Sequence, residues 1–230
     1  MDGYKTSYGK IKRNKFMKTV YSYENVLNLI KSLKFETIAN SDIIDLICSF
    51  GLNFDSRDIY GEYKNCMNKP EELGLWQRPK QLSSLIKHLL DHCDINSFLE
   101  VGTFKSSTFL ILREFLSLKN KNLKAVTIDP GKFVSDEILN HFKINYKQIG
   151  IDKIQEQYDL IFIDGNHSYN AVKQDYQKAL ELKPKYILFH DIVDKNCPDV
   201  VKFWNEIKHN LNYKEFTDCD DLMGLGLVEL

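Results

Sequence analysis

Acidic residues follow apolar runs at four places between residues 97 and 191. They are Glu100 in SFLEVG, Asp129 after LKAVTI, Asp164 after YDLIFI and Asp191 after YILFH. In an open parallel sheet, ligands bind outside the carboxyl ends of the strands, at the point where the strand order reverses. We therefore expect these carboxylates to meet at one sheet edge and to form the reaction centre there.

The first of these strand ends leads into the stretch EVGTFKSST. Gly102 would let the backbone turn tightly and approach a ligand, and a helix beginning near Ser106 would point free N–H groups at the same space. Asp129, at the end of the next strand, is the type of group that accepts hydrogen bonds from both hydroxyls of an adenosine ribose. Together these features favour a nucleoside-bearing cofactor, with Glu100, Gly102, Thr103, Ser107 and Asp129 as binding candidates.

The same stretch discriminates between cofactors. A dinucleotide site requires G-x-G-x-x-G so that backbone amides can hold the pyrophosphate, but EVGTFKSST contains one glycine. S-adenosylmethionine carries no phosphate, and its sulfonium and amino groups suit a loop with an acid such as Glu100. The sequence therefore favours S-adenosylmethionine and disfavours a nicotinamide-dependent dehydrogenase.

Two histidines accompany the later acids. His167 follows Asp164 by three residues in a predicted loop, and His190 directly precedes Asp191. A histidine with a pKa near neutrality can act as a general base. His167 could equally orient Asp164 or cap the following helix, and His190 could be a structural residue at the end of a buried strand. Asp164, His167 and His190 are the catalytic candidates.

The elements that position these residues follow from hydrophobic periodicity. Helical spacing predicts helices from Tyr21 to about Leu33 and from Ser41 to about Phe50, with Ser41-Asp42 as the N-cap signal of the second, and Gly51 to Gly74 is expected to be a loop. From Pro79 onward helix and strand signals alternate, which is typical of βαβ units and a parallel sheet. NYKEFT and GLGLVEL predict an antiparallel hairpin at the far sheet edge. We expect a Rossmann-like, mostly parallel seven-stranded α/β sheet with a C-terminal antiparallel hairpin and an N-terminal helical extension.

Composition limits the alternatives. The chain has 230 residues and a net charge of −1, so no overall field attracts nucleic acid. The five cysteines show no C-x-x-C pair, which indicates neither a disulfide framework nor a zinc knuckle and favours the cytoplasm. No apolar run is long enough to span a membrane.

We expect a basic tail over residues 1–20, a helical extension and loop over 21–75 that could cover the acceptor, and a cofactor-binding domain over 76–230.

The motifs LEVGTFKSST, TIDP, DLIFIDGNHSYNAVKQD and ILFHDI resemble those of class I S-adenosylmethionine-dependent methyltransferases. The resemblance is nearest to the small-molecule and sugar O-methyltransferase group, which includes macrolide-sugar methyltransferases and cephalosporin-hydroxylase-like proteins, and it runs from about Trp76 to the C-terminus. It implies that Glu100 and Gly102 line the methionine side of the cofactor, that Asp129 holds the ribose, that residues from Ile149 to Asp152 flank the adenine, and that Asp164 lies beneath the transferring methyl group.

In several members of that group, a magnesium ion is held by the acid at the position of Asp164 and by an acidic pair after the fifth strand. Here that pair is His190-Asp191. Magnesium prefers oxygen ligands, so an imidazole weakens a magnesium site. A softer divalent metal at Asp164, His190 and Asp191 and a metal-free site with a histidine base both remain open. A second departure is Lys105-Ser106-Ser107, which stands where relatives usually have glycine.

These features predict O-methylation of a sugar or another polyhydroxylated small molecule, with a nucleotide-sugar included among the candidates. The alternative is a catalytically degenerate methyltransferase fold that binds a nucleoside and serves as a scaffold or subunit, and the altered glycine loop motivates it. We expect no nucleic-acid or membrane partner, and the sequence leaves a homo-oligomer open.

Overall fold

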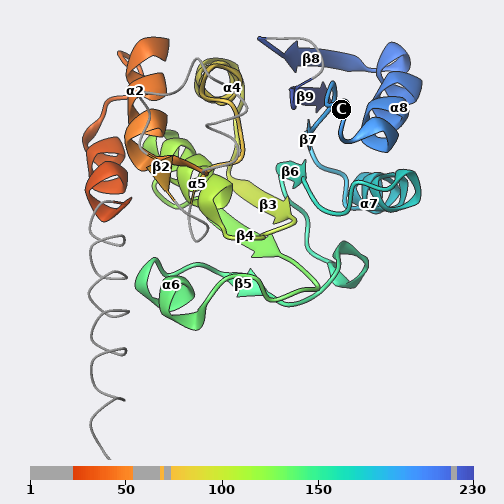
Figure 1. Ribbon diagram of the computed structural model, residues 1–230, viewed down its shortest axis with the longest axis horizontal. Coiled ribbons are helices and arrows are strands. Elements are labelled where there is room, and N and C mark those ends of the chain that lie inside the picture. Colours follow the sequence, from red (N-terminus) through yellow and green to blue (C-terminus); the bar gives the residue numbers. More distant parts are fainter. Residues whose placement is uncertain (1–22, 54–67, 70–73, 219–221) are drawn as a thin grey trace, which may run out of the picture.

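The computed structural model describes residues 23–53, 68–69, 74–218 and 222–230 (Figure 1). The predicted basic tail over residues 1–20 lies outside the described residues, as does most of the predicted loop between Gly51 and Gly74. The domain boundary expected near residue 75 stays a prediction, although the segments on either side of it share one hydrophobic core.

Seven strands form one sheet in the order β5-β4-β3-β6-β7-β9-β8 (Figure 1). The strands in chain order are β3 Ser97–Val101, β4 Lys124–Ile128, β5 Tyr146–Lys147, β6 Leu160–Ile163, β7 Tyr186–His190, β8 Asn212–Phe216 and β9 Leu225–Glu229. The first five strands of the sheet order run parallel, and β9 runs antiparallel to both β7 and β8. The predicted fold class is confirmed. The hairpin closes the sheet with β8 as its outer strand, because β9 inserts between β8 and β7.

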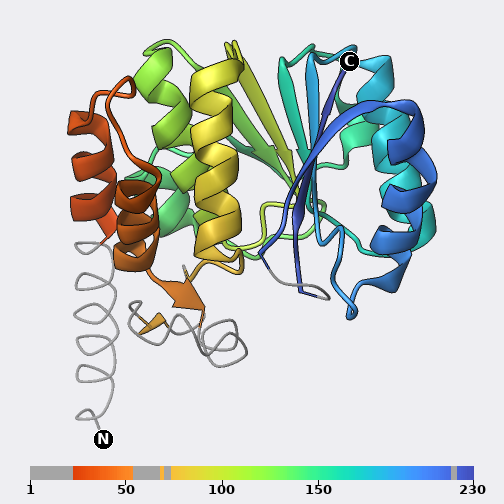
Figure 2. The ribbon, with the colours of Figure 1, turned by 90° about the horizontal axis from the view of Figure 1, so that it is seen from above.

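The central strands are buried on both faces because their alternate residues enter two separate cores. Leu160 and Phe162 belong to the core that also contains residues of the N-terminal helices and of α4 and α5. Ile161 and Ile163 belong to the core on the opposite face of the sheet. Figure 2 shows the helices in two layers on either side of the sheet. Near-continuous apolar strands are expected where both faces are covered. The helices of the domain are α4 Pro79–His92, α5 Ser107–Lys119, α6 Asp136–His141, α7 Tyr169–Glu181 and α8 Pro198–Ile207, with short 3-10 turns at Ile151–Lys153 and Lys208–Asn210.

The N-terminal helices pack beside α4 and α5. Helical residues 23–32 and α2, Asn40–Phe50, bury Tyr23, Ile43 and Phe50 in the core that contains Leu82 of α4. The expected N-cap at Ser41-Asp42 was wrong, because α2 begins at Asn40 and its N-cap is Ala39. The Asp42 carboxylate still caps this end, since it accepts the Ala39 N–H at 3.1 Å. An acid in the first turn also favours the helix dipole.

Two further expectations need correction. The segment from Gly51 to Gly74 is not a loop throughout, because β1, Leu52–Asn53, pairs in parallel with β2, Asn68–Lys69. The cysteine pattern indicated no disulfide, but Cys48 is disulfide-bonded, whereas Cys93 and Cys197 are free. Within the described ranges, no helix has both the length and the apolar character that a membrane crossing requires.

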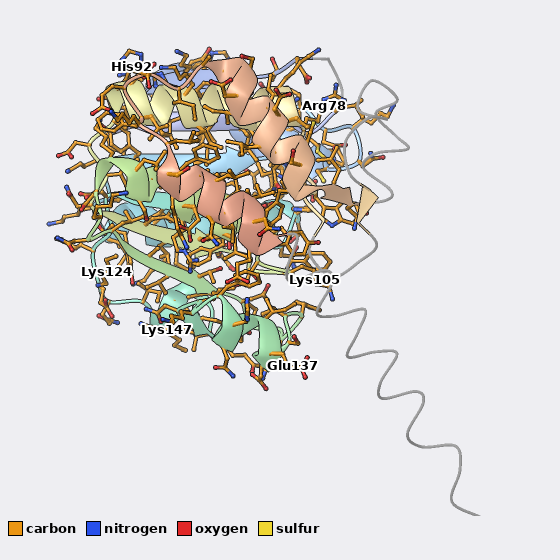
Figure 3. The ribbon with its side chains drawn as sticks, turned by 90° about the vertical axis from the view of Figure 1, so that its left-hand side faces the viewer. Arg78, His92, Lys105, Lys124, Glu137 and Lys147 are labelled. Atoms are coloured by element: carbon orange, nitrogen blue, oxygen red, sulfur yellow. The ribbon has the colours of Figure 1, made fainter. Side chains whose placement is uncertain are left out.

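The topology brings four strand ends to one side of the molecule. Strand β3 pairs with β4 on one side and β6 on the other, so the strand order reverses at β3. Figure 3 shows Arg78 and Lys105 at the end of the sheet where β3 terminates, and His92 and Lys124 at the opposite end. A ligand cleft is expected at the first of these ends.

Candidate functional site

A cavity of about 790 Å³ lies at the carboxyl ends of β3, β4, β6 and β7. That volume is within the range of small-molecule sites. Its lining includes nearly every residue predicted from the sequence, namely Glu100, Gly102, Thr103, Ser107, Asp129, Asp164, His167, His190 and Asp191. Asp152 is not among the lining residues. The structure therefore brings together the ends of four separate strands, as the sequence pattern predicted.

At Gly102 the backbone that leaves β3 comes very close to the backbone that leaves the neighbouring strand β6. Its φ is 101°, and a Cβ built there would lie 2.0 Å from the carbonyl oxygen of Asp164. Only glycine combines this conformation with so close an approach of two backbones. The turn continues through Phe104 and Ser106, which also have positive φ, of 40° and 63°. Left-handed conformation costs about 1–2 kcal/mol for a residue with a side chain, so Ser106 holds this conformation under strain.

Helix α5 begins directly after this turn and faces the cavity with its N-terminus. Ser107, the first residue of the helix, lines the cavity, and its buried hydroxyl has no hydrogen-bond partner among the described residues. Buried polar atoms are normally satisfied. The free amides of the first turn and this hydroxyl are suited to an anionic group of a ligand, such as a carboxylate.

Glu100 lies at the floor of the cavity and is almost completely buried. Burial raises the pKa of its carboxyl well above the ordinary value, and the nearby charges of Asp164 and Asp129 raise it further, while a hydrogen bond from Thr127 opposes them. That hydroxyl lies 2.6 Å from Glu100, and the Thr103 hydroxyl lies 2.7 Å from Thr127. A positively charged ligand would stabilise the ionised form of Glu100.

Asp129 is held by backbone amides on both sides. Its carboxylate accepts the N–H of Phe104 at 3.1 Å and the N–H of Gly131 at 2.8 Å. Each carboxylate oxygen has lone pairs beyond the one used here, so the group can still accept hydrogen bonds from two ligand hydroxyls. The Tyr146 hydroxyl donates to the carbonyl of Gly131 at 2.8 Å and so fixes the same turn.

The loop after β5 contributes backbone and apolar side chains from Ile149 to Ile151. Asp152 instead points to solvent and pairs with Lys153 at 2.8 Å. The acid that the structure does place in this part of the cavity is Asp175 on α7, whose pKa is raised to about 6 by burial and by the charge of Asp152.

Two carboxylates and two imidazoles converge at the ends of β6 and β7. His190 Nδ1 lies 3.2 Å from Asp164 Oδ1 and 3.2 Å from Asp191 Oδ2. His167 Nε2 lies 3.3 Å from Asp191 Oδ2 and 3.9 Å from Asp164 Oδ1. Asp191 has a φ of 60°, a conformation that few side chains adopt and that turns its carboxylate into the cluster.

The charges of this cluster fix its protonation. The pKa of His167 is raised to about 10 by contact with the Asp164 carboxylate and the Cys197 thiol, and by the charge of Asp191. Burial lowers the pKa of His190, but the two carboxylates raise it more, so that it lies well above the ordinary value. Burial raises the pKa of Asp164, and the two histidines lower it more, to about 2. In the metal-free protein these contacts therefore favour the protonated form of both imidazoles.

Two members of the cluster around Asp164 and His167 were not among the predicted site residues. Gln77 donates from Nε2 to Asp164 Oδ2 at 3.2 Å, and its Oε1 accepts the hydroxyl proton of Thr108 at 2.5 Å. Cys197 places its thiol 3.4 Å from His167 Nδ1. Both stand outside the strand ends that the sequence pattern singled out. Their only sequence signals are the polar residues of W-Q-R before α4 and a cysteine before the proline that begins α8.

The lining fits the cofactor implied by the sequence. Six acids line the cavity, namely Glu100, Asp129, Asp164, Asp175, Asp191 and Asp194, against one lysine and two histidines. A cationic ligand suits this excess of carboxylates, and the unpartnered Ser107 hydroxyl suits its anionic end. For a metal, two groups of side chains have ligand atoms within 4.8 Å of one another: Asp164, His190 and Asp191, and His167, Asp191 and Cys197.

Comparison with known proteins agrees with this geometry. Residues 99–192 match a family described as "Methyltransferase domain". No protein of curated function matches the sequence significantly. The matched segment runs from β3 through the end of β7 and so contains the strand ends that line the cavity.

Several solved structures share the fold at low sequence identity. The O-methyltransferase TomG of Streptomyces achromogenes, solved with S-adenosylmethionine, is 15% identical, with a TM-score of 0.52 over 77% of this chain and 86% of its own. The O-methyltransferase of Bacillus cereus, solved with S-adenosylhomocysteine, is 14% identical, with a TM-score of 0.52 over 76% and 89%. A putative O-methyltransferase of Klebsiella pneumoniae is 16% identical, with a TM-score of 0.50 over 93% and 99%. The chain therefore has the fold of the class I S-adenosylmethionine-dependent methyltransferases, as the resemblance of its motifs predicted.

Proposed function

We propose that this protein is an S-adenosylmethionine-dependent O-methyltransferase that acts on a hydroxyl group of a small molecule, with a sugar or another polyhydroxylated compound as the leading acceptor class. The observation that carries the proposal is the convergence of Glu100, Asp129 and Asp164 on one cavity at the reversal point of the sheet. S-adenosylmethionine supplies the methyl group and is itself a cation with two ribose hydroxyls.

Each part of the cavity has a role in holding that cofactor. The Asp129 carboxylate, already oriented by two backbone amides, accepts hydrogen bonds from the ribose hydroxyls. The carboxylates of Glu100 and Asp164 provide negative charge for the ammonium and sulfonium groups, and the N-terminus of α5 with Ser107 binds the carboxylate. Ile149 and Ile151 provide apolar surface for the adenine.

The acceptor would occupy the part of the cavity beyond Asp164, which Trp76, Asn196 and Met223 line together with the cluster of acids and histidines. Aromatic surface and a high density of hydrogen-bonding groups favour a polyhydroxylated ring. In the free enzyme His167 and His190 are hydrogen-bond donors, because their pKa values are raised. Because the pKa of Asp164 is held at about 2, a carboxylate of the cluster takes the hydroxyl proton only as the oxygen–methyl bond forms and makes that hydroxyl strongly acidic, and it then passes the proton to water; alignment supplies most of the acceleration.

A divalent metal in this site would be held by Asp164, His190 and Asp191. It would act as a Lewis acid that lowers the pKa of a bound hydroxyl.

Methyl transfer tests the proposal directly. Purified protein is incubated with S-adenosylmethionine bearing a deuterated methyl group and with a panel of sugars, nucleotide-sugars and phenols, and products are followed by mass spectrometry. We expect a mass-shifted O-methyl product that is lost in Asp164→Asn and retained in Asp152→Asn, which alters an exposed acid outside the cavity. Cofactor binding without labelled product from any acceptor would contradict catalysis and favour a nucleoside-binding scaffold.

A further inference from the structure

The metal-binding side chains of this site extend beyond the strand ends. Besides Asp164, His190 and Asp191, a second group is formed by His167, Asp191 and Cys197, and Asp191 belongs to both. The five side chains therefore form one continuous set of donors around Asp191. They offer two carboxylates, two imidazoles and one thiol.

We propose that this set binds a borderline divalent cation such as Zn²⁺ or Co²⁺ rather than Mg²⁺, and that Cys197 supplies a thiolate ligand to it. The role of the ion in catalysis rests on the proposed methyl transfer, but its binding does not. The proposal follows from the donor chemistry, the spacing of the donors and the setting of Cys197.

Donor chemistry excludes a hard cation as the preferred occupant. Mg²⁺ requires oxygen ligands in near-octahedral geometry, whereas imidazole and thiolate ligands select zinc and its first-row neighbours. Three of the five side chains here offer nitrogen or sulfur. His190 cannot offer oxygen in place of the carboxylate that the resemblance to magnesium-dependent relatives implies.

The spacing within each group is close to that of ligands of one ion. Two ligands of the same ion can be no further apart than twice the bond length, which for zinc is about 4.0–4.6 Å, and the ligand atoms within each group lie within 4.8 Å of one another. The thiol of Cys197 lies 3.4 Å from His167 Nδ1, whereas Asp191 Oδ2 lies 3.3 Å from His167 Nε2. Coordination by Cys197 and Asp191 together therefore requires the His167 ring to move.

Cys197 is placed where its sulfur can reach an ion in the cluster. It is the N-cap residue of the ten-residue helix α8, lines the cavity and forms no disulfide. Its Sγ belongs to the same group of closely spaced ligand atoms as His167 and Asp191. Cys93, which is also free, is buried and does not line the cavity.

Cobalt spectroscopy tests the proposal without measuring turnover. Metal-free protein is titrated with Co²⁺, and the thiolate-to-cobalt charge-transfer band is recorded in the near ultraviolet. We expect the band in the wild type and in Cys93→Ser, and its loss in Cys197→Ser with at least about a tenfold fall in Co²⁺ affinity. Zn²⁺ should displace Co²⁺ at equal concentration, whereas a hundredfold excess of Mg²⁺ should not. Circular dichroism checks that Cys197→Ser is folded.

Absence of the band in the wild type, its survival in Cys197→Ser, or displacement of Co²⁺ by a hundredfold excess of Mg²⁺ would each overturn the proposal. Calorimetry with S-adenosylhomocysteine on the same samples separates this failure from that of the proposed function. A band without cofactor binding would leave the ion site intact and remove the methyltransferase assignment, and cofactor binding without a band would do the reverse.

Discussion

Gly102→Ala should disrupt both stability and cofactor binding, because this glycine is where the ends of β3 and β6 touch. The added Cβ would lie 2.0 Å from the Asp164 carbonyl oxygen and 2.5 Å from its carbonyl carbon, and the residue would have to keep a φ of 101°. The positive φ alone costs about 1–3 kcal/mol, and forced overpacking against backbone costs about 1–3 kcal/mol more. We expect a loss of about 2–6 kcal/mol in the free energy of unfolding.

A neighbouring glycine provides the control. A Cβ at Gly165 would meet the nearest atom, a carboxylate oxygen of Asp175, at 3.5 Å, which is an ordinary contact, and its φ is not positive. Urea denaturation should therefore show less than about 1 kcal/mol of change in Gly165→Ala. The midpoint temperature of thermal unfolding should fall by about 4 °C or more in Gly102→Ala, since each 1 kcal/mol of lost stability shifts it by about 2–4 °C in a protein of this size. Equal stability of the two variants would refute the close approach of the two backbones at Gly102.

Three further predictions follow from the contacts around Asp164 and α4. Gln77→Leu removes the donor to Asp164, so turnover should fall by about tenfold or more while the affinity for S-adenosylhomocysteine, measured by calorimetry, changes little. In metal-free protein, the stabilising contribution of Asp164 is present above its unfolded pKa of 3.8 and lost as pH falls through about 2. The stabilising contribution of His167 is present below its unfolded pKa of 6.5 and lost as pH rises through about 10. In Asp164→Asn, the midpoint of urea unfolding should therefore vary less with pH than in the wild type, at both the acid and the alkaline end of the range. Asp218→Ala should lower the free energy of unfolding by about 3 kcal/mol, because the buried Arg78 guanidinium loses a bidentate partner at 2.8 and 3.1 Å.

Most of the fold could be predicted because its signals are local. The apolar runs that end in Asp164 and His190 are buried on both sides, and the proline that begins α4 marks a helix start whatever the tertiary context. The N-cap of α2 was missed by two residues because Asp42 caps from inside the helix, as the third helical residue rather than from the N-cap itself. Short pairings such as β1 with β2 depend on contacts distant in sequence, which periodicity does not record.

The candidate site likewise contains residues that the sequence predicted and residues that it did not. Residues at strand ends were found because the topology of a parallel sheet fixes where they meet. Gln77 and Cys197 were not, because each comes from a segment outside the strands and its place in the cavity depends on how a helix packs. Asp152 was expected beside the adenine because the resemblance to methyltransferases implied it for residues Ile149 to Asp152, but the turn that contains it directs its side chain outward to Lys153. The protonation of His167 also depends on three groups that only the folded chain brings together.

Calorimetric titration of the purified chain with S-adenosylhomocysteine tests the central claim, that this cavity is an S-adenosylmethionine site, most directly. We predict one binding site in the wild type and at least about tenfold weaker binding in Asp129→Ala, since hydrogen bonds to a charged acceptor contribute about 1.5–3 kcal/mol each. NAD should produce no binding heat. Absence of binding in the wild type, or unchanged affinity in Asp129→Ala, would contradict the account.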